Sequence, residues 1–347
     1  FKIRRRKVCG FESHSRHHDV HRYTCAFFTR IPLFVQVFRA IPPVADTPVV
    51  LTIGNFDGVH LGHQTLLAQL SAKARALGVP AAVMTFEPHP REFFMHEPRP
   101  MRLTSLREKL ELFRAAGVDR VYVCRFDARF AALGAQAFID ELLVRGLAVR
   151  HLIIGDDFRF GRGREGDFER LRAAGALHGF SVASMDTVEI GGERASSSAV
   201  REALEQGDLA RAERLLGRPY AISGRVEHGQ KIGRQLGFPT ANIQLKRRSL
   251  PLSGIYAAAV TGGGLVNAPG AASVGVRPTI ADGLRPTCEV YVLDRKVDLY
   301  DQHVSVRFCH KLRDEARYEG LEALREAIAQ DVANTRRWFA ENPISED

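Results

Sequence analysis

The chain has 347 residues, of which 45% are hydrophobic and 26% charged, a composition typical of a soluble globular protein long enough for two domains. The sequence has no apolar run of about 18 residues that could span a membrane, and its five cysteines are scattered without a Cys-x-x-Cys pair. This usage argues against a disulfide framework or a zinc site and favours a reducing compartment, the cytoplasm.

The net charge of +9 lies mostly at the N-terminus. Residues 1–39 hold nine lysines and arginines against two acidic residues, so the remaining chain carries only +2. Residues 1–33 show no hydrophobic period, and Thr29, Arg30 and Pro32 interrupt their last apolar stretch. A targeting peptide or a polyanion-binding tail is one interpretation. We expect instead a disordered extension, or upstream sequence included by a wrongly chosen start.

From Val49 onward, short apolar runs alternate with segments of helical spacing. The predicted strands are 49–53, 81–86, 121–124 and 151–154, and the predicted helices include 66–70, 107–116, 138–143 and 199–216. This alternation predicts an α/β fold, a doubly wound parallel sheet with helices on both faces. Ligands of such sheets bind beyond the carboxyl ends of the strands, where the polar motifs of this region lie.

After Gly217-Arg218-Pro219 the pattern changes to short alternating strands separated by glycine and proline turns. The predicted strands are 220–226, 254–260, 272–276, 288–293 and 303–308, followed by an amphipathic helix over 321–339. This is an all-β, barrel-like layout with a C-terminal helix. We therefore predict three parts: the extension 1–33, an α/β domain 34–216 and a β-barrel domain 217–343.

The first candidate site is the segment from Gly54 to His63, which follows the first strand. His60 and His63 are three residues apart, so on a first helical turn their side chains share one face. Gly62 permits close approach of a ligand, and a helix N-terminus favours phosphate. Two surface histidines near a turn are the alternative, but this spacing after a strand favours a phosphate site.

This segment resembles the nucleotidyltransferase signature, shared with cytidylyltransferases and pantetheine-phosphate adenylyltransferases. Two segments that follow strands, Phe86–Pro90 and Gly155–Gly161, and a third that opens a helix, Arg194–Arg201, are similar to the adenylyltransferase half of bacterial bifunctional riboflavin kinase/FMN adenylyltransferases. Ala195 and Ser198 depart mildly from the family's usual Ile and Thr. For Glu87 and Asp157, solvated loop carboxylates are the alternative, and one of the three serines could be only a helix N-cap.

The resemblance implies that His60 and His63 stabilise charge on the attacked phosphate without a covalent intermediate. It implies an ATP site made of Gly54, Phe56, Asp57, His60, Gly62, His63, Arg194, Ser196, Ser197, Ser198 and Arg201. It also implies a flavin site made of Asn55, Glu87, Pro88, His89, Asp157 and Phe158.

The second candidate site is the glycine-rich segment from Gly229 to Asn242. Its glycines permit close backbone approach to phosphate, and Lys231 and Arg234 supply positive charge. Thr240 and Asn242 offer the oxygen ligands that Mg²⁺ prefers. The Gly-Lys-Ser/Thr core of a Walker loop is absent, which disfavours a P-loop kinase. A plain surface loop is the alternative.

The stretch Gly237-Phe238-Pro239-Thr240-Ala241-Asn242 resembles the flavokinase signature, and segments around 253–256, 274–279 and 288–291 match that family in order. The resemblance implies a small β-barrel of the six-stranded type. The resemblance implies an ATP site made of Gly229, Lys231, Gly233, Arg234, Gly237, Phe238, Pro239, Thr240 and Asn242, with Thr240 and Asn242 as metal ligands. It implies a flavin site made of Gly254, Tyr256, Glu289 and Arg313, with Glu289 as the catalytic base. An outward-facing strand residue is the alternative for Glu289, and a solvated or salt-bridged surface residue for Arg313.

Together the resemblances imply that riboflavin is phosphorylated to FMN in the C-terminal domain and that FMN is adenylylated to FAD, with release of pyrophosphate, in the N-terminal domain. ATP is the co-substrate, Mg²⁺ the cofactor, and FMN and FAD the products. We expect a monomer or weak homo-oligomer with no nucleic-acid or membrane partner. The alternatives are an enzyme with one active half, or a flavin- or nucleic-acid-binding protein that uses the basic tail.

Overall fold

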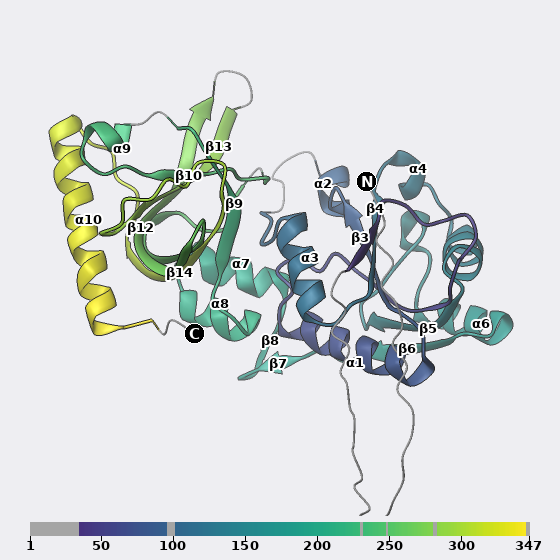
Figure 1. The fold of residues 1–347 in the computed structure, drawn as a ribbon. Helices are drawn as coiled ribbons and strands as arrows, with labels where there is room; N and C mark the ends of the chain where they lie inside the picture. The colour runs from purple at the N-terminus through teal and green to yellow at the C-terminus, as the bar shows by residue number, and fades with distance from the viewer. Residues whose placement is uncertain (1–34, 96–100, 230–231, 248, 280–282, 345–347) are drawn as a thin grey trace, which may run out of the picture. The chain divides into compact units, whose positions relative to one another are not determined.

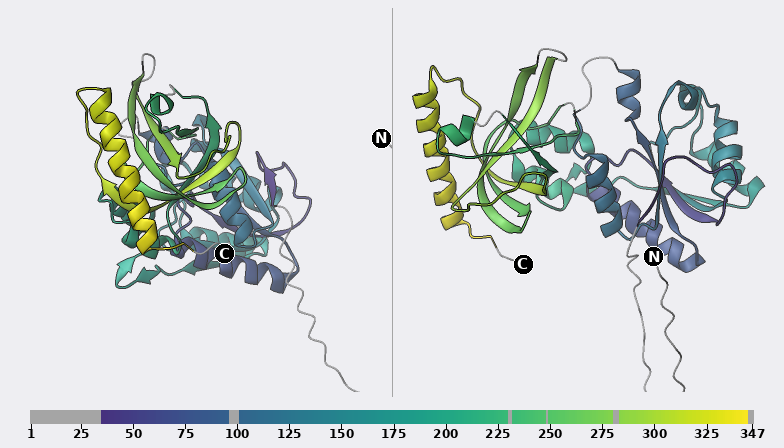
Figure 2. Two further views of the ribbon diagram at one scale, coloured as in Figure 1. Left: turned by 60° about the vertical axis from the view of Figure 1, so that its left-hand side comes forward. Right: turned by 45° about the horizontal axis from the view of Figure 1, so that its top comes forward.

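The computed structural model describes residues 35–95, 101–229, 232–247, 249–279 and 283–344, and all of them belong to one compact unit, Pro32–Asp347. The predicted extension 1–33 and the predicted phosphate ligand Lys231 lie outside these residues. Figures 1 and 2 show a sheet region flanked by helices and a barrel region that carries a long helix on its outer side.

The N-terminal region is built on a six-stranded sheet in the order β1-β4-β3-β2-β5-β6, with every recorded pairing parallel. The strands are β1 (Gln36–Phe38), β2 (Val49–Ile53), β3 (Ala81–Glu87), β4 (Arg120–Arg125), β5 (Val149–Gly155) and β6 (Ser181–Met185). The strand order reverses between β2 and β5. In open parallel sheets this reversal is where a ligand crevice forms.

Helices cover both faces of this sheet, as predicted. Neighbouring residues of β2 belong to different cores: Leu51 packs with Leu143 and Leu171 on one face, whereas Val50 packs with Leu67 and Phe113 on the other. A strand buried on both faces reads as the continuous apolar run that the sequence shows. The main helices are α1 (Leu61–Leu77), α3 (Leu106–Ala115), the π-helix η1 (Phe138–Gly146) and α6 (Phe168–His178).

Short elements complete this region: α2 (Pro90–Phe94), α4 (Ala128–Ala131), α5 (Ala135–Ala137), the 3₁₀ turn η2 (Arg162–Arg164), β7 (Glu189–Ile190) and β8 (Glu193–Arg194). The single helix predicted over 199–216 is wrong. The chain forms α7 (Ser197–Glu205) and α8 (Leu209–Leu216), because Gly207 adopts a φ of 74° and Asp208 starts a new helix by capping Arg211 N.

The C-terminal region is a closed barrel in the order β10-β13-β12-β11-β14-β9, with antiparallel pairing throughout. Its strands are β9 (Ala221–Glu227), β10 (Ala241–Ile243), β11 (Gly254–Gly262), β12 (Leu265–Thr279), β13 (Gly283–Val292) and β14 (His303–Arg313). The sequence predicted five of these strands and missed β10. Helix α9 (Ile232–Gln235) precedes β10, and α10 (Leu321–Glu341) lies on the outside of the barrel (Figure 1).

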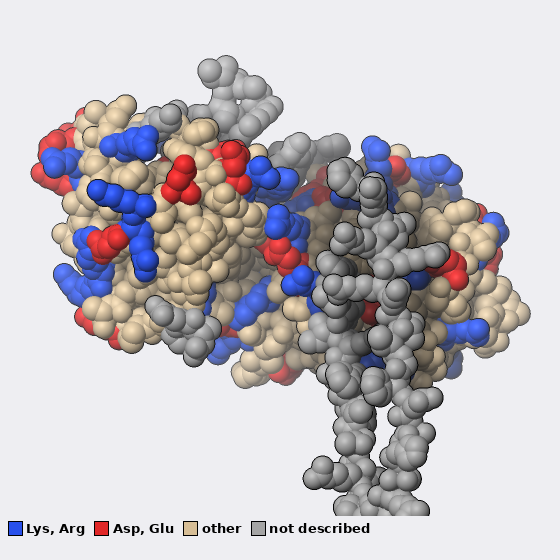
Figure 3. Space-filling model, viewed as in Figure 1, with Lys and Arg blue, Asp and Glu red and all other residues tan. Residues whose placement is uncertain are grey.

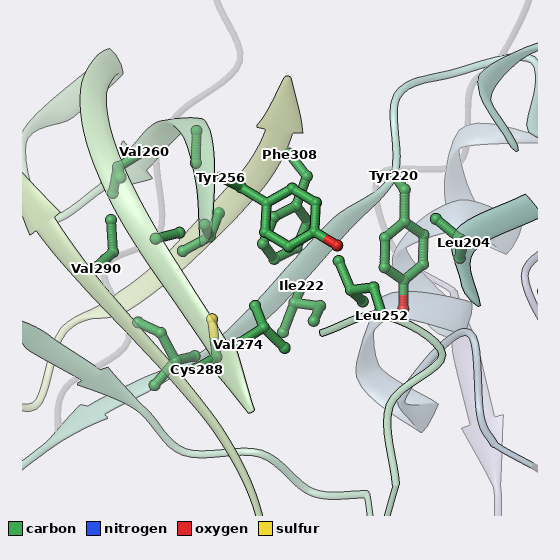
Figure 4. Packing of buried hydrophobic residues seen from close by; sticks show 14 of the residues in the cluster. Leu204, Tyr220, Ile222, Leu252, Tyr256, Val260, Val274, Cys288, Val290 and Phe308 are labelled. Carbon is green, nitrogen blue, oxygen red and sulfur yellow. The ribbon is translucent and has the colours of Figure 1, made fainter. Parts of the chain in front are cut away.

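The barrel interior is filled by alternate strand residues. Figure 4 shows Tyr256 and Phe308 in its centre, with ring centroids 5.2 Å apart, surrounded by Ile222, Val274 and Val290. Buried side chains therefore fill this part of the barrel interior, as expected for a small barrel.

Two surface observations bear on partners. None of the helices in the described part of the chain is long and apolar enough to cross a membrane. On the face shown in Figure 3, basic and acidic side chains are interspersed rather than segregated into one basic stripe. A nucleic-acid interface would favour the segregated pattern.

Candidate active sites

A cavity of about 870 Å³ lies at the carboxyl ends of the sheet strands, near the upper end of the range of about 300–1,000 Å³ for small-molecule sites. Segments after β2, β3 and β5 line it, together with the start of α7. The predicted site residues that line it are Gly54, Asn55, Phe56, Asp57, His60, Gly62, His63, His89, Asp157, Phe158, Arg194, Ser196, Ser197, Ser198 and Arg201. The structure thus brings together four motifs that are distant in sequence.

The two histidines stand at the start of α1 on one face. His60 is the N-cap residue and His63 lies in the first turn, and their rings stack with centroids 3.7 Å apart. Both Nδ1 atoms are buried and have no hydrogen-bond partner in the structure. Unpaired buried polar atoms are rare in native proteins, so a ligand that satisfies them is the natural explanation.

The histidines are neutral near pH 7. Burial, opposed by Asp57, lowers the pKa of His60 to about 4. Burial and the neighbouring His60 keep the pKa of His63 well below its ordinary value. Each ring can therefore donate one hydrogen bond to a phosphate oxygen without a positive charge of its own. The cationic side chains around the cavity supply the charge instead.

Asp57 has a structural task that the sequence did not reveal. Its buried carboxylate accepts hydrogen bonds from Leu103 N and Thr104 N, each at 3.0 Å, and pairs with Arg201 Nη2 at 2.5 Å. Burial raises the pKa of this carboxyl, but Arg201 and the backbone donors outweigh burial and lower it. Asp57 therefore fixes the 103–104 segment and Arg201 at the cavity wall.

The three serines at the start of α7 differ in their contacts. Ser196 caps the helix by accepting from Ala199 N, and Ser197 Oγ donates to the Asp57 carbonyl at 2.8 Å. Ser198 lines the cavity and is exposed. Arg194, on the strand just before, reaches Asp157 at 3.5 Å. The helix N-terminus and Arg194 together present donors to a phosphate.

The flavin side differs from the expectation in two residues. Glu87 and Pro88 are not among the residues that line the cavity, and Glu87 pairs with Arg102 at 2.7 Å. Arg102 also binds Glu92 of α2, at 2.5 Å. His89 lines the cavity and caps α2 through its Nδ1. In the structure Glu87 therefore belongs to an ion-pair network with Arg102 and Glu92.

Several functional candidates were missed by sequence reasoning. Aromatic rings line the cavity in mutual contact: Phe86, Phe126 and Phe130 have centroids 5.5–5.8 Å apart, and Phe94, 64% exposed, joins Phe126. Such rings suit a flat aromatic ligand. The cavity is also lined by the arginines Arg91, Arg159, Arg162 and Arg164. Phe86 and Arg159 lie within the segments already singled out in the sequence, whereas the other phenylalanines and arginines belong to no motif and are brought together only by the fold.

Lys109 is a further residue without a sequence signal. It is buried on α3, and its Nζ donates to the Asn55 carbonyl at 2.6 Å. Burial lowers its pKa, against the charges of Asp57 and Glu87. This hydrogen bond ties helix α3 to the Gly54–His60 turn.

A second cavity, of about 530 Å³, lies on the barrel. The predicted residues that line it are Gly229, Arg234, Pro239, Thr240 and Asn242, and the unpredicted residues include Arg295, Lys296 and Tyr300. Close packing explains two of the glycines: a Cβ at Gly229 would collide with the Asn242 side chain, and one at Gly233 with the Phe238 carbonyl.

The predicted base and the predicted metal ligand contact each other. Thr240 Oγ1 donates to Glu289 Oε2 at 3.0 Å, and Glu289 is the register partner of Asn242 across β10 and β13. No group of three or more His, Cys, Asp or Glu that could hold a metal occurs in the described part of the chain. The oxygens of Thr240 and Asn242 fit a hard cation only if phosphates complete its coordination.

Several predicted residues do not line this second cavity, namely Gly233, Gly237, Phe238, Gly254, Tyr256, Glu289 and Arg313. Tyr256 is fully buried in the barrel core, and its hydroxyl donates to the Ser253 carbonyl at 2.9 Å. Arg313 pairs with Asp331 of α10 at 2.5 Å, which is the salt-bridged alternative. These two side chains are occupied by packing and ion pairing in the structure.

Two family models match the chain in the order of its two domains. The FAD synthetase model matches residues 43–199, and the riboflavin kinase model matches residues 216–339. The residues that line the second cavity fall within the second matched range, and those that line the first cavity fall within the first range except Arg201.

Similar proteins cover most of the chain. It is 50% identical over 308 residues to the bifunctional riboflavin kinase/FMN adenylyltransferase of Escherichia coli (strain K12), covering 88% of this chain and 98% of that one. It is 52% identical over 287 residues to the protein of the same description from Pseudomonas fluorescens, covering 83% of this chain and 92% of that one. A solved structure described as a macrolide-efflux protein from Streptococcus pneumoniae has a TM-score of 0.73 and 28% identity, covering 88% of this chain and 100% of that one.

Proposed function

Because the chain belongs to the family of bifunctional riboflavin kinases/FMN adenylyltransferases, and so has both activities, we propose that each activity uses the cavity of its own domain. The C-terminal domain phosphorylates riboflavin to FMN, and the N-terminal domain adenylylates FMN to FAD and releases pyrophosphate. We propose domain boundaries at 34–216 and 217–343.

The adenylyl-transfer site is the cavity at the strand ends. The phosphate of FMN attacks the α-phosphorus of ATP, and the bond to pyrophosphate breaks. His60 and His63 donate hydrogen bonds to the oxygens on which charge develops, Arg194 and the start of α7 bind the remaining phosphates, and the phenylalanine-lined wall holds the flavin ring. The stacked histidine pair with unpaired Nδ1 atoms carries this assignment.

The phosphoryl-transfer site is the cavity on the barrel. Glu289 accepts the proton of the ribityl hydroxyl as that oxygen attacks the γ-phosphorus of ATP, and Thr240 orients the Glu289 carboxylate through their hydrogen bond. Arg234, Arg295 and Lys296 supply positive charge around the phosphates. Mg²⁺ bound by Thr240, Asn242 and ATP would offset phosphate charge in this step.

We propose further that the protein acts in the cytoplasm as a monomer or weak homo-oligomer, without nucleic acid or a membrane. The interspersed charge on the face shown in Figure 3 supports the absence of a nucleic-acid partner for that face.

The function is tested by incubating the protein with riboflavin and ATP, with and without Mg²⁺, and separating the products by chromatography. We expect FMN and then FAD to form with Mg²⁺ and neither without it. Formation of only one flavin would leave a single active half, and formation of neither in the presence of Mg²⁺ would overturn the proposal.

A further inference from the structure

The turn just before His60 has a strained backbone. Phe56, Gly58 and Val59 have φ values of 50°, 81° and 43°. Glycine adopts this left-handed region readily, but for a β-branched residue such as Val59 it is unfavourable. A strained turn persists only where its surroundings hold it, and this one sets the direction in which the His60 side chain leaves the backbone.

The Arg218 side chain donates hydrogen bonds to the backbone of this turn. Its Nη2 donates to the Gly58 carbonyl at 2.6 Å and its Nη1 to the Val59 carbonyl at 3.1 Å. These are the two carbonyls immediately before His60. Among the residues that the structure describes, no carboxylate is recorded within ion-pair distance of Arg218, so backbone carbonyls take up its donors. A planar guanidinium holds two carbonyls in a fixed geometry, whereas the donors of an ammonium rotate and impose no such geometry.

Arg218 lies outside the motifs that carry the resemblance to nucleotidyltransferases. It belongs to the segment between α8 and β9, and the adjoining Tyr220 anchors that segment by donating to the Leu103 carbonyl at 3.1 Å. Leu103 N in turn donates to the Asp57 carboxylate at 3.0 Å. The start of the barrel domain is therefore bonded to both sides of the turn that precedes His60.

The charge of Arg218 also acts on His60. The charged groups that face this imidazole are Asp57 of the turn, Arg194, Arg201 of α7 and Arg218, with His63 stacked on it from α1. Asp57 favours the protonated ring, whereas the three arginines disfavour it. Removal of Arg218 would thus favour protonation of His60.

We propose that Arg218 is a positioning residue for adenylyl transfer, which holds the Gly58–Val59 turn so that His60 points into the cavity. This inference rests on the proposed function of that cavity. The simpler possibility is that Arg218 only closes the end of α8, since its Nη1 also donates to the Leu216 carbonyl at 3.2 Å.

The test uses the full chain and measures both activities of each variant. We expect Arg218→Gln to lower kcat for FMN adenylylation by about tenfold to a hundredfold, the size expected for a misplaced catalytic group. KM for FMN and ATP and the rate of riboflavin phosphorylation should stay within about twofold, because the binding groups and the barrel site are intact. The acid limb of the adenylylation pH profile should move to higher pH.

Two further variants separate positioning from folding. Arg218→Lys keeps the charge but lacks the planar guanidinium that holds both carbonyls in fixed geometry, so its kcat should be reduced while its acid limb stays near that of the parent chain. Arg214→Gln is the matched control, an exposed arginine on the neighbouring helix α8, and should leave both activities unchanged. The proposal is overturned if Arg218→Gln keeps adenylylation within twofold, or if it lowers both activities and the Tm together. Absence of FAD formation by the parent chain would instead refute the proposed function.

Discussion

The histidine pair in the first cavity combines burial with hydrogen-bonding atoms that nothing in the described protein satisfies. A buried polar group that lacks a partner costs stability, so this arrangement is expected where a ligand supplies the partner. Because both rings are neutral at pH 7, their burial costs little there, and it becomes costly in acid, where the rings would be protonated.

This burial predicts a pH-dependent stability. The pKa of His60 is about 4 when folded and about 6.5 in the unfolded chain. Above pH 6.5 the ring is neutral in both states and does not affect the free energy of unfolding. Between pH 6.5 and 4 the unfolded chain binds the proton more readily than the folded protein, so the free energy of unfolding falls by about 3 kcal/mol for this residue. Thermal unfolding of the ligand-free protein between pH 7 and 4 should show a steep fall in Tm, and His60→Asn should make the fall shallower. His178→Asn, outside the cavity, is the control. If the Tm of His60→Asn falls with pH as steeply as that of the parent chain, burial of His60 does not cause the acid sensitivity.

Asp57 gives a second prediction at the residue scale. Asp57→Ala removes the partner of Arg201 and leaves two buried backbone donors unpaired. Loss of one member of a buried ion pair costs about 3–5 kcal/mol, so the free energy of unfolding in urea should fall by that amount. Glu111→Ala breaks an exposed pair with Arg107 and should change it by about 0.5 kcal/mol or less. If both variants lower the free energy of unfolding by a similarly small amount, Asp57 does not hold the 103–104 segment and Arg201 in the way described.

The sequence predicted which residues gather at the first cavity better than it predicted what they do. The spacing of glycine, histidine and serine residues identified the cavity wall, because these residues lie close together in the sequence, within short segments beside a strand end or a helix start. Asp57 and Glu87 were expected to face ligands, yet their partners Arg201 and Arg102 lie 144 and 15 residues away in the chain. A long-range ion pair has no local pattern, so only the fold revealed it.

Strand order is what makes the first cavity possible. The two strands at the reversal, β2 and β5, end in the Gly54–His63 and Gly155–Gly161 segments, and both segments line the cavity. The alternation of strands and helices predicted the parallel sheet, and the strand-end rule predicted the place of the site. The spatial order itself was not predicted, because periodicity does not specify which strands pair.

Local chemistry also explains the element errors. The apolar spacing of α7 and α8 is continuous enough to resemble one helix, and Gly207 breaks it. Strand β10 has three residues and follows a proline turn, so it gave too little alternation to recognise.

Helix α10 supplies a prediction at this scale. Arg313 on β14 binds Asp331 on α10 through two nitrogens, at 2.8 and 2.5 Å, and this hydrogen bonding raises the pKa of Arg313. Arg313→Met and Asp331→Ala should each lower the free energy of unfolding by about 2 kcal/mol, and the double variant little more than either single variant. The KM for riboflavin should change by the same factor in the two single variants. A rise in KM confined to Arg313→Met would show that Arg313 contacts the flavin instead.

At the scale of the whole molecule, the chain keeps two cavities on two different architectures while sharing buried contacts. Arg247 of the barrel region is buried against Glu108 of α3, and it donates to the Leu103 carbonyl at 2.9 Å. Glu108 also accepts from Ser223 N at 2.6 Å. The residues that we propose as catalytic, by contrast, do not overlap: His60 and His63 line one cavity, and Thr240, hydrogen-bonded to Glu289, lines the other.

If the two sites work separately, two variants that each lack one activity should complement each other. His63→Asn should convert riboflavin to FMN but make no FAD, and Glu289→Gln should convert FMN to FAD but make no FMN from riboflavin. Each missing activity should fall by about a hundredfold or more.

The decisive measurement is the yield of FAD from riboflavin and ATP when the two variants are mixed. We expect the mixture to make FAD although neither variant does so alone, because FMN released by one protein reaches the intact site of the other. Loss of both activities in either variant, or no FAD from the mixture, would contradict it.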